Sequence, residues 1–409
     1  MTGTDRFDDL DGLSANAVKL ALAGRIGAHA RALQDDHVVL YAGANILTPS
    51  LRASFDPTIS LMPAMGPPDD KEQPGSDLVA SLEIFSSRLA ARVFGAAFAD
   101  CRLPSCTIAN LAVFSAFVPR SALVLAPAAA DGGHLSQRRG GTPSMLGLAV
   151  SDLPFDGLRQ CLDAQAAAAM IRRDRPSLVV LGRSVILRPD DLEPAIAACR
   201  AVGALSLYDA SHVAGLIAGG VFPNPLAAGV DLVTTSTYKT LAGPTGAIVM
   251  GQNPEHGRLF ADFVDRTLLA NQDAARLAPL CGVLAEFAEP GAYAARILHL
   301  AERLKRSLVD AGLPVLLAGE PARTHQVVVP IGDLGETKTV VADLERARIL
   351  VGRCPVPGTP GRHGLRFGTQ LLARTARPGL RTARPVRPSR DDPCSTTSRL
   401  IAAIEAFLD

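Results

Sequence analysis

Short, almost unbroken apolar runs separated by alanine-rich helical patterns restrict the fold of this chain more than any other feature. Such runs are typical of strands in a mostly parallel sheet that helices cover on both faces. Between two of the runs, residues 190–202 place apolar side chains at helical spacing, which predicts a crossover helix joining two parallel strands. The chain is therefore expected to be an α/β protein with strands at 121–126, 177–182, 204–209, 231–235 and 246–250.

The length of 409 residues predicts more than one structural unit. We expect an N-terminal helical segment at 1–40, a large domain at 41–285 and a smaller C-terminal α/β domain at 286–409. The further elements expected are an amphipathic helix at 13–34, a long connecting helix at 284–312, strands at 314–318 and 326–330, and a helix over the last residues.

One stretch, residues 374–393, departs from this pattern because it carries six Arg and four Pro without apolar periodicity. We interpret it as an extended surface loop, and the alternative is a basic arm.

Composition excludes several classes of function. The 41 basic and 40 acidic residues give a net charge of +1, so neither nucleic acid nor an anionic membrane is an expected partner. No apolar run approaches the ~18–20 residues of a membrane span, and the acidic start does not resemble a secretory signal. The seven cysteines are scattered without a CxxC pair. This predicts a protein of the reducing cytoplasm with neither a disulfide framework nor a metal site.

The segment 208–246 contains the main candidate catalytic residues. Asp209 ends one predicted strand, and Lys239 follows the next strand in a hydroxyl-rich turn, so both lie where parallel sheets bind ligands. Such a lysine can be a solvated surface charge or an ion-pair partner of Asp209. The functional alternative is a Schiff-base lysine that holds pyridoxal phosphate (PLP), with the carboxylate on the pyridinium nitrogen. A desolvated Asp favours the protonated ring, and a buried lysine beside a cation has the lowered pKa that attack on a carbonyl requires.

Two motifs in this segment resemble serine hydroxymethyltransferase, a PLP-dependent family of fold type I, the aspartate aminotransferase fold. Residues 209–216, DASHVAGL, match the family's D-x-A-H-x-x-G-L, and residues 234–246, TTSTYKTLAGPTG, match T-T-T-T-H-K-T-L-x-G-P-x-G. The resemblance extends from about Tyr41 to Thr369. It implies that Lys239 forms the imine with PLP and that Asp209 binds the pyridine nitrogen. It also places His212 near the phenolic oxygen and Ser236 near the imine or the phosphate.

Motifs upstream of this segment extend the resemblance. Residues 131–135, DGGHL, are similar to H-G-G-H-L, which implies that the flat ring of His134 stacks on the cofactor. Residues 105–110, SCTIAN, stand where the family has S-G-S-Q-A-N and where a helix start holds the phosphate. Ser105 and Thr107 keep the hydroxyls of that motif. Cys106 replaces its glycine, so a contact through the backbone N–H is expected there.

Two further matches concern the phenolic oxygen and the substrate. Ser184, in residues 182–184, matches the family serine that contacts the phenolic oxygen. Arg366, in residues 364–369 (GLRFGT), matches the arginine of G-x-R-x-G-T that binds the substrate carboxylate. A planar guanidinium suits a carboxylate through two hydrogen bonds, so the resemblance implies an α-amino acid substrate.

The departures from the family gather in its folate, proton-transfer and cross-subunit parts. Its A-S-E-N is AGAN at 42–45, which loses a serine that helps hold the carboxylate. Its Y-A-E-G is PAMG at 63–66, where Met65 cannot transfer a proton. The remaining departures are Tyr238 for histidine, Thr245 for arginine, Ala129 for a folate-packing leucine, and QDAA at 272–275 for Q-G-G-P. Together they predict a changed reaction on a retained cofactor.

We therefore expect a PLP-dependent enzyme that acts at Cα or Cβ of a specialised amino acid, in natural-product biosynthesis. Three reactions stay open at this point: retro-aldol or transaldol exchange, β-elimination from a cysteine conjugate, and decarboxylation coupled to deamination. Tyr238 is a candidate acid–base or orienting group, and the alternative is a packed aromatic. Residues 60–75 and Arg366 are expected to determine which bond at Cα breaks.

Two other functions remain alternatives. One is a true folate-dependent hydroxymethyltransferase, and the other is a non-catalytic binding protein with the same fold. Because the family builds its site at a dimer interface, the resemblance also implies a homodimer.

Overall fold

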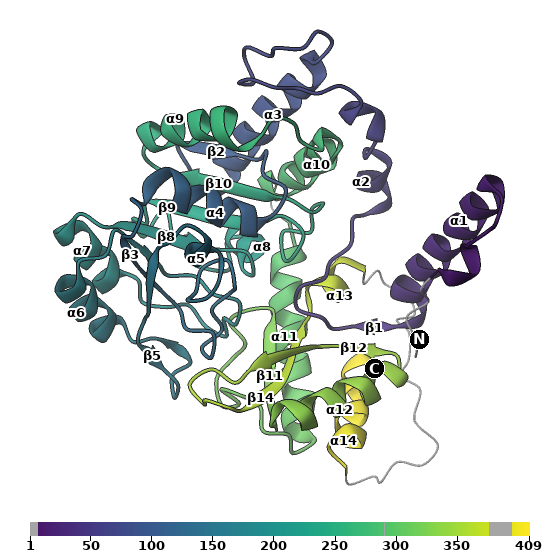
Figure 1. The fold of residues 1–409 in the computed structure, drawn as a ribbon. Helices are drawn as coiled ribbons and strands as arrows, with labels where there is room; N and C mark the ends of the chain where they lie inside the picture. Colours follow the sequence, from purple (N-terminus) through teal and green to yellow (C-terminus); the bar gives the residue numbers. More distant parts are fainter. Residues whose placement is uncertain (1–6, 290, 376–394) are drawn as a thin grey trace.

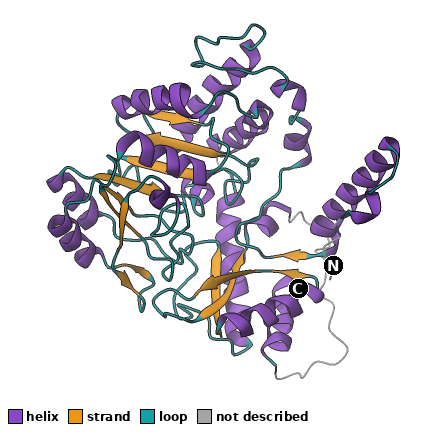
Figure 2. Cartoon of the chain, in the orientation of Figure 1, coloured by secondary structure: helices purple, strands orange, loops and turns teal. Residues whose placement is uncertain are grey.

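A seven-stranded sheet forms the centre of the computed structural model, which describes residues 7–289, 291–375 and 395–409 (Figures 1 and 2). Its strands, in spatial order, are β2 (Phe98–Asp100), β10 (Ala247–Gly251), β9 (Leu232–Ser236), β8 (Leu205–Asp209), β7 (Leu178–Val180), β3 (Leu123–Ala126) and β4 (Ala149–Asp152). The pairs from β9 to β4 are parallel, whereas β10 runs antiparallel to both of its neighbours. The α/β class and all five strands expected at the centre of the chain are confirmed.

Both faces of this sheet are buried. Leu178 and Val180 of β7 belong to one apolar cluster, while Val179 between them belongs to the cluster on the other face. Helices cover the two faces, which explains why the strand sequences show no polar alternation. The helices are α3 (Asp77–Phe94), α4 (Cys106–Phe117), α5 (Thr142–Met145), α6 (Ala164–Asp174), α7 (Glu193–Val202), α8 (Ala214–Ala218), α9 (Pro254–Phe263) and α10 (Leu277–Ala288).

The predicted crossover helix is α7, which joins β7 to its parallel neighbour β8. Gly203 ends α7 with a positive φ of 75°, a conformation that glycine adopts without steric cost. Because β7, β8 and β9 are parallel, their carboxyl ends meet at one edge, where Asp209 and the turn that follows Ser236 lie side by side.

The C-terminal part has its own sheet and core. The antiparallel strands β11 (Gln326–Gly332), β14 (His363–Gly368) and β13 (Gly352–Pro355) pack against three helices, and a parallel pair, β1 with β12, lies beside them. The bounds of these remaining elements are α11 (Tyr293–Asp310), α12 (Leu334–Arg346), α14 (Thr396–Leu408), β1 (Val38–Val39) and β12 (Ile349–Leu350). The chain also contains α1 (Ala15–Arg31), α2 (Pro49–Ala53), α13 (Gln370–Thr375), β5 (Phe155–Asp156) and β6 (Cys161–Leu162). The domain boundaries at 40 and 285 stay a prediction.

Two expected elements differ from the structure. The single helix at 284–312 is wrong: α10 ends at Ala288 and α11 begins at Tyr293, with the sequence Glu-Pro-Gly at 289–291 in between. The strand at 314–318 is also wrong, because Val315 is followed by a series of turns that leads into β11.

The two ends of the chain agree with the sequence only in part. The N-terminal helix exists as α1, but it has no buried residue, and it projects from the rest of the chain in Figure 1. Its leucine and isoleucine side chains are therefore largely exposed in this chain, including Leu20 and Ile26. The arginine- and proline-rich stretch lies outside the described residues beyond Thr375, while the last helix is confirmed as α14.

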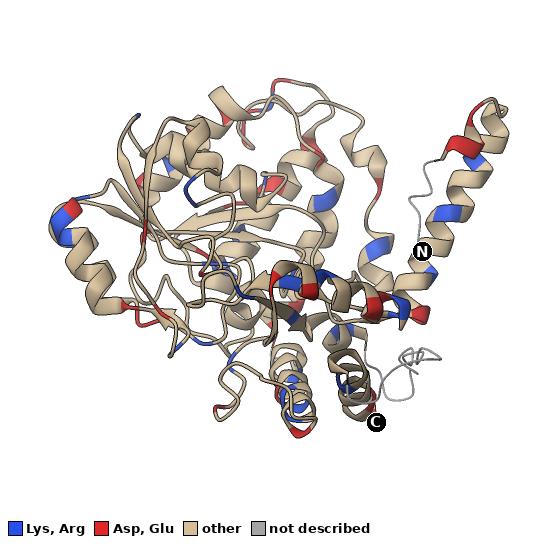
Figure 3. Cartoon of the chain, turned by 60° about the horizontal axis from the view of Figure 1, so that its bottom comes forward, with Lys and Arg blue, Asp and Glu red and all other residues tan. Residues whose placement is uncertain are grey.

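Charges of both signs are interspersed along the helices and loops seen in Figure 3, in keeping with the balanced composition. Within the described residues, no helix is both long and apolar enough to cross a membrane.

Gly182 offers a test of how closely the strand ends must approach. A Cβ at this position would lie 2.2 Å from the carbonyl oxygen of Asp209 and 2.5 Å from its nitrogen. We expect Gly182→Ala to lower the free energy of unfolding by about 1–3 kcal/mol and to weaken PLP binding, because the backbone that carries Asp209 must shift. Gly319→Ala, with nothing within 4 Å of the added carbon, is the matched control and should change stability by less than about 0.5 kcal/mol. Urea unfolding and PLP titration measure both effects, and equal stability of the two variants would contradict the expectation.

Candidate active site

Lys239 lies in a tightly closed turn between β9 and β10. The backbone N–H of Thr237 donates to the carbonyl of Gly246 at 3.1 Å, and the N–H of Gly243 donates back to the carbonyl of Thr237 at 2.7 Å. The Nζ atom of Lys239 lies 3.2 Å from Nε2 of His212, in the segment that follows β8. Thr240 binds the same segment, since its hydroxyl donates to the carbonyl of His212 at 3.1 Å. The turn therefore directs the lysine towards the end of β8.

The carboxylate of Asp209, at the end of β8, is buried and accepts hydrogen bonds on both oxygens. The N–H of Ser211 donates to Oδ1 at 3.0 Å. Three side chains meet Oδ2: the amides of Asn110 and Gln137 donate to it, and the thiol of Cys106 lies 3.6 Å away. Burial alone would raise the pKa of Asp209, but the hydrogen bonds of Ser211 and Asn110 and the charge of Lys239 together lower it below its ordinary value. This carboxylate therefore stays ionised.

His134 is oriented by the same cluster. Its Nδ1 accepts from the backbone N–H of Ser136 at 3.2 Å and lies 2.8 Å from the Ser136 hydroxyl, which itself accepts from Asn110 at 2.8 Å. Asn110 is fixed in turn by the hydroxyl of Thr234, which donates to its Oδ1 at 2.6 Å. A chain of hydrogen bonds thus joins His134 to Asp209 through one asparagine. Burial lowers the pKa of His134, so the ring is neutral at pH 7.

The first turn of α4 faces the cleft and is suited to an anion. The hydroxyl of Ser105 accepts from the N–H of Ile108 at 3.3 Å and so caps the helix, while Cys106 and Thr107 are its first two residues. A helix N-terminus presents unpaired N–H groups and a partial positive charge, which suit a phosphate. Burial, the largest cause, raises the pKa of Cys106, so this thiol stays protonated beside Asp209.

Arg366 lies beside this cleft rather than in its lining. It projects from β14, and its Nη1 donates to the carbonyl of Ser184 at 2.7 Å. Burial, the largest cause, lowers the pKa values of both His212 and Lys239, and the charge of Arg366 adds to this effect. The other ten candidate residues line one cleft: Ser105, Cys106, Thr107, His134, Ser184, Asp209, His212, Ser236, Tyr238 and Lys239.

Sequence reasoning missed several residues of the site. Gln137, Ser211 and Arg183 also line the cleft, and Asn110 lies directly behind it. Asn110 and Gln137 fall within or next to the matched motifs, and that position was the only signal available for them. His325, the residue before β11, stacks on His212 with ring centres 5.6 Å apart, and no motif pointed to it.

Several buried polar atoms in and around this cleft have no partner among the described residues, as a site for a bound group would predict. They include Nδ1 of His212, Oε1 of Gln137 and Nε of Arg366. Unpaired buried groups are rare in folded proteins because each costs about 1–3 kcal/mol. The donor set also fits PLP: a lysine amine for the aldehyde, an ionised carboxylate for the ring nitrogen, and a helix N-terminus with hydroxyls for the phosphate.

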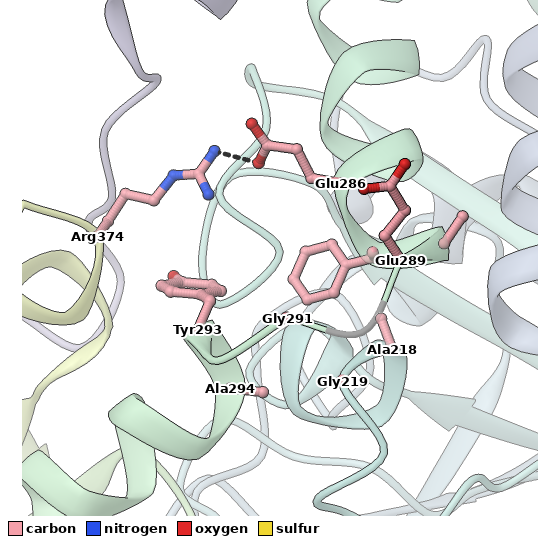
Figure 4. A pocket seen from close by; sticks show the side chains of 10 residues that line it. Ala218, Gly219, Glu286, Glu289, Gly291, Tyr293, Ala294 and Arg374 are labelled. Carbon is pink, nitrogen blue, oxygen red and sulfur yellow. Dashed lines mark hydrogen bonds and ion pairs between the residues drawn. The ribbon is translucent and has the colours of Figure 1, made fainter.

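Asn45 connects the Lys239 turn to the C-terminal part of the chain. Its amide donates to the carbonyl of Lys239 at 2.6 Å and lies 2.7 Å from the hydroxyl of Tyr293, the first residue of α11. Tyr293 faces a second pocket of about 290 Å³, where Arg374 pairs with Glu286 at 2.6 Å (Figure 4). The guanidinium of Arg374 also lies over the Tyr293 ring, 5.4 Å from its centre. The backbone of Lys239 is thus fixed by Asn45, which Tyr293 binds in turn.

Residues 60–75, expected to help select the reaction, do not line this cleft. They bind α3 and the segment at 272–276 instead. Nζ of Lys71 lies 2.7 Å from Oε2 of the buried Glu83, whose other oxygen accepts from Gln272 at 2.6 Å. Ser60 donates to Asp273 at 2.8 Å. Two segments that depart from the family are therefore joined in one hydrogen-bonded unit that does not line this chain's own cleft.

The sequence profile of the serine hydroxymethyltransferase family matches residues 25–382. The chain belongs to the serine hydroxymethyltransferase family. Its cofactor is accordingly pyridoxal 5′-phosphate, and it is a PLP-dependent transferase or lyase of fold type I that acts on a small-molecule amino acid.

Individual relatives carry different names. The chain is 32% identical over 341 residues to an alpha-methylserine aldolase of Ralstonia sp, covering 82% of this chain and 78% of that protein. It is 34% identical over 346 residues to a serine hydroxymethyltransferase of Methanopyrus kandleri, covering 82% and 80%. The crystal structure of an L-threonine transaldolase from Pseudomonas fluorescens is similar with a TM-score of 0.82 and 26% identity, covering 88% of this chain and 83% of that one.

His325 generates a prediction on pH. Burial, the largest cause, and the Arg366 charge lower its pKa to about 3, and its Nε2 lies 3.3 Å from the carbonyl of Ala42. An unfolded histidine has a pKa of about 6.5, so below that pH the unfolded chain binds the proton more strongly and stability falls. We expect His325→Gln to reduce the loss of unfolding free energy between pH 6.5 and pH 5 by about 2 kcal/mol.

Urea unfolding of the PLP-loaded protein at both pH values measures this difference. His29→Gln, on the exposed surface of α1, is the matched control and should leave the difference unchanged. An unchanged pH dependence in His325→Gln would show that this histidine is not held neutral by the fold.

Proposed function

We propose that this chain is a folate-independent aldolase that cleaves and re-forms the Cα–Cβ bond of β-hydroxy-α-amino acids. The observation that carries the proposal is a complete cofactor side of the cleft combined with Met65 where the family has its proton-transferring glutamate. The names of two of the three relatives described above, alpha-methylserine aldolase and L-threonine transaldolase, support this choice, while the third is a serine hydroxymethyltransferase. They do not refer to β-elimination or decarboxylation.

The residues of the cleft can perform this reaction. When bound, PLP supplies an electron sink for the electron pair left on Cα as the bond to Cβ breaks. Asp209 keeps the ring nitrogen protonated, because its buried carboxylate is held ionised. Burial lowers the pKa of Lys239, so its Nζ can accept the proton of the β-hydroxyl while Cβ departs as an aldehyde, and can then return a proton to Cα.

The remaining side chains orient the substrate. Arg366 binds its carboxylate and His134 covers the face of the ring. The ring centre of the half-buried Tyr238 lies 5.9 Å from Nζ of Lys239, and burial, the largest cause, raises its pKa. It therefore keeps its proton and acts as a hydrogen-bond donor rather than a base. A second aldehyde that enters before Cα is protonated gives transaldol exchange with the same residues, and the similarity to L-threonine transaldolase favours this as the second activity.

We further propose that the protein is a homodimer in which the unit formed by residues 60–75 and 272–276 contacts the partner's cleft. The absence of these residues from the lining of this chain's own cleft supports the proposal, as do the exposed apolar side chains of Leu61 and Met62. A cytoplasmic location and a role in natural-product biosynthesis remain predictions that rest on the cysteine usage and on the departures from the family.

Aldehyde release tests the proposed reaction. The PLP-loaded protein should release aldehyde from L-threonine, α-methylserine or another β-hydroxy amino acid, at a rate that tetrahydrofolate does not raise. Lys239→Ala should lower the rate by about 10³-fold or more, since both the cofactor bond and the proton acceptor are lost. Lys338→Ala, on the exposed face of α12, is the matched control. Trapping the aldehyde with a hydrazine measures the rate, and turnover of L-serine that depends on tetrahydrofolate would overturn the proposal.

Arg366→Lys tests the carboxylate contact. A lysine keeps the charge but cannot form two parallel hydrogen bonds, so we expect KM for the amino acid to rise about 10- to 100-fold with little change in kcat. PLP affinity should be unchanged. Arg353→Lys, at an exposed position of the neighbouring strand β13, controls for the general effect of replacing an arginine by a lysine. Steady-state kinetics of aldehyde release decide the matter, and an unaltered KM would remove Arg366 from substrate binding.

A further inference from the structure

The segment 40–45 crosses the end of β14, beside Arg366. The N–H of Gly368 donates to the carbonyl of Leu40 at 2.8 Å, and Tyr41 forms a single antiparallel bridge with Phe367. The amide of Gln370 donates to the carbonyls of Tyr41 at 2.9 Å and Ala44 at 2.6 Å. The backbone of Tyr41 is therefore fixed from several sides next to the arginine of β14.

The ring of Tyr41 fills space that two glycines leave open. A Cβ built on Gly43 would lie 2.9 Å from Cε1 of the ring, and one built on Gly352 would lie 2.9 Å from Cε2. Gly352 pairs with Arg366 across β13 and β14, so the missing Cβ would point to the same face of the sheet as the Arg366 side chain. The Tyr41 ring thus lies on the Arg366 face.

Gly43 stands where the family has the serine that helps hold the substrate carboxylate. A serine side chain there and the observed Tyr41 ring cannot coexist, since carbon atoms do not approach to 2.9 Å without one moving. This chain therefore lacks the serine hydroxyl at position 43 and has instead the phenol of Tyr41, two residues earlier, in the same space. The Tyr41 side chain is partly exposed, and its hydroxyl has no hydrogen bond within the described part of the chain.

We infer that the Tyr41 hydroxyl replaces the family serine and donates a hydrogen bond to the substrate carboxylate, beside Arg366. This rests on the proposed action on an α-amino acid. The Tyr41 ring lies against Gly352, the residue paired with Arg366, so the phenol lies close to the arginine on the same face of the sheet, and Tyr41 interacts electrostatically with both Arg366 and Tyr238. The side chain of a tyrosine is longer than that of a serine. The Tyr41 ring therefore limits the space that is left for substituents on Cα of the substrate.

Tyr41→Phe removes the hydroxyl and keeps the ring. We expect the dissociation constant of L-serine, followed by the change in PLP absorbance, to rise about 10-fold or more, the size of a hydrogen bond to a charged group. The dissociation constant of ethanolamine, the same molecule without its carboxylate, should not change, and KM should rise without a comparable fall in kcat. Tyr208→Phe is the matched control, because Tyr208 lines a separate cavity with Asp190 and Phe222.

A second pair of variants tests whether Tyr41 takes the place of the family serine. Gly43→Ser alone should weaken L-serine binding by displacing the Tyr41 ring, whereas Gly43→Ser combined with Tyr41→Ala should bind L-serine more tightly than Tyr41→Ala alone. Equal effects of Tyr41→Phe on L-serine and ethanolamine, or no effect on either, would overturn the inference. If the wild-type protein shows no response to L-serine or to any other amino acid, the proposed function fails as well, so the two failures are distinguishable.

Discussion

The buried carboxylate of Asp209 is the constraint on which the site depends. An ionised group removed from water is costly unless it is paired and hydrogen-bonded. Here its partners come from α4, from the segment after His134 and from the turn after β8, through Asn110, Gln137 and Ser211. None of these segments can move without leaving a buried charge unsatisfied. The same hydrogen bonds that stabilise the fold therefore place the residues that hold the cofactor.

This arrangement explains how the reaction can change while the cofactor side is retained. The divergent segments at 60–75 and 272–276 bind one another and the buried Glu83, not the Asp209 cluster. Burial raises the pKa of Glu83, although the nearby Lys71 opposes this. Substitutions in these segments, such as glutamate to Met65, thus leave the hydrogen bonds of Asp209 intact. Much of the divergence therefore lies outside the hydrogen bonds that hold Asp209, although Cys106 and Tyr238 in the cleft also depart from the family.

The sequence predicts the central sheet well, because strands buried on both faces need continuous apolar runs, and such runs are visible without tertiary information. The errors arise where a few residues determine the local structure. The sequence Glu-Pro-Gly at 289–291 interrupts a helical pattern, and the apolar run at 314–318 forms turns instead of a strand. In the cleft, motif matching indicated the residues with distinctive chemistry, such as Lys239 and His134. It missed Gln137 and Asn110, because the role of an amide depends on which neighbour the fold places beside it.

The segment 40–45 completes this picture, because it touches both ends of the reacting centre. At one end the carbonyl of Leu40 is bound by Gly368, two residues beyond Arg366, and at the other the side chain of Asn45 donates to the carbonyl of Lys239. Six residues of chain, bound by Gln370 in the middle, thus fix the separation between Arg366 and Lys239. A substrate anchored by its carboxylate and attached through its amine must span that separation. Under the roles proposed for Arg366 and Lys239, a fixed separation favours α-amino acids, in which one carbon atom joins the carboxylate and the amine.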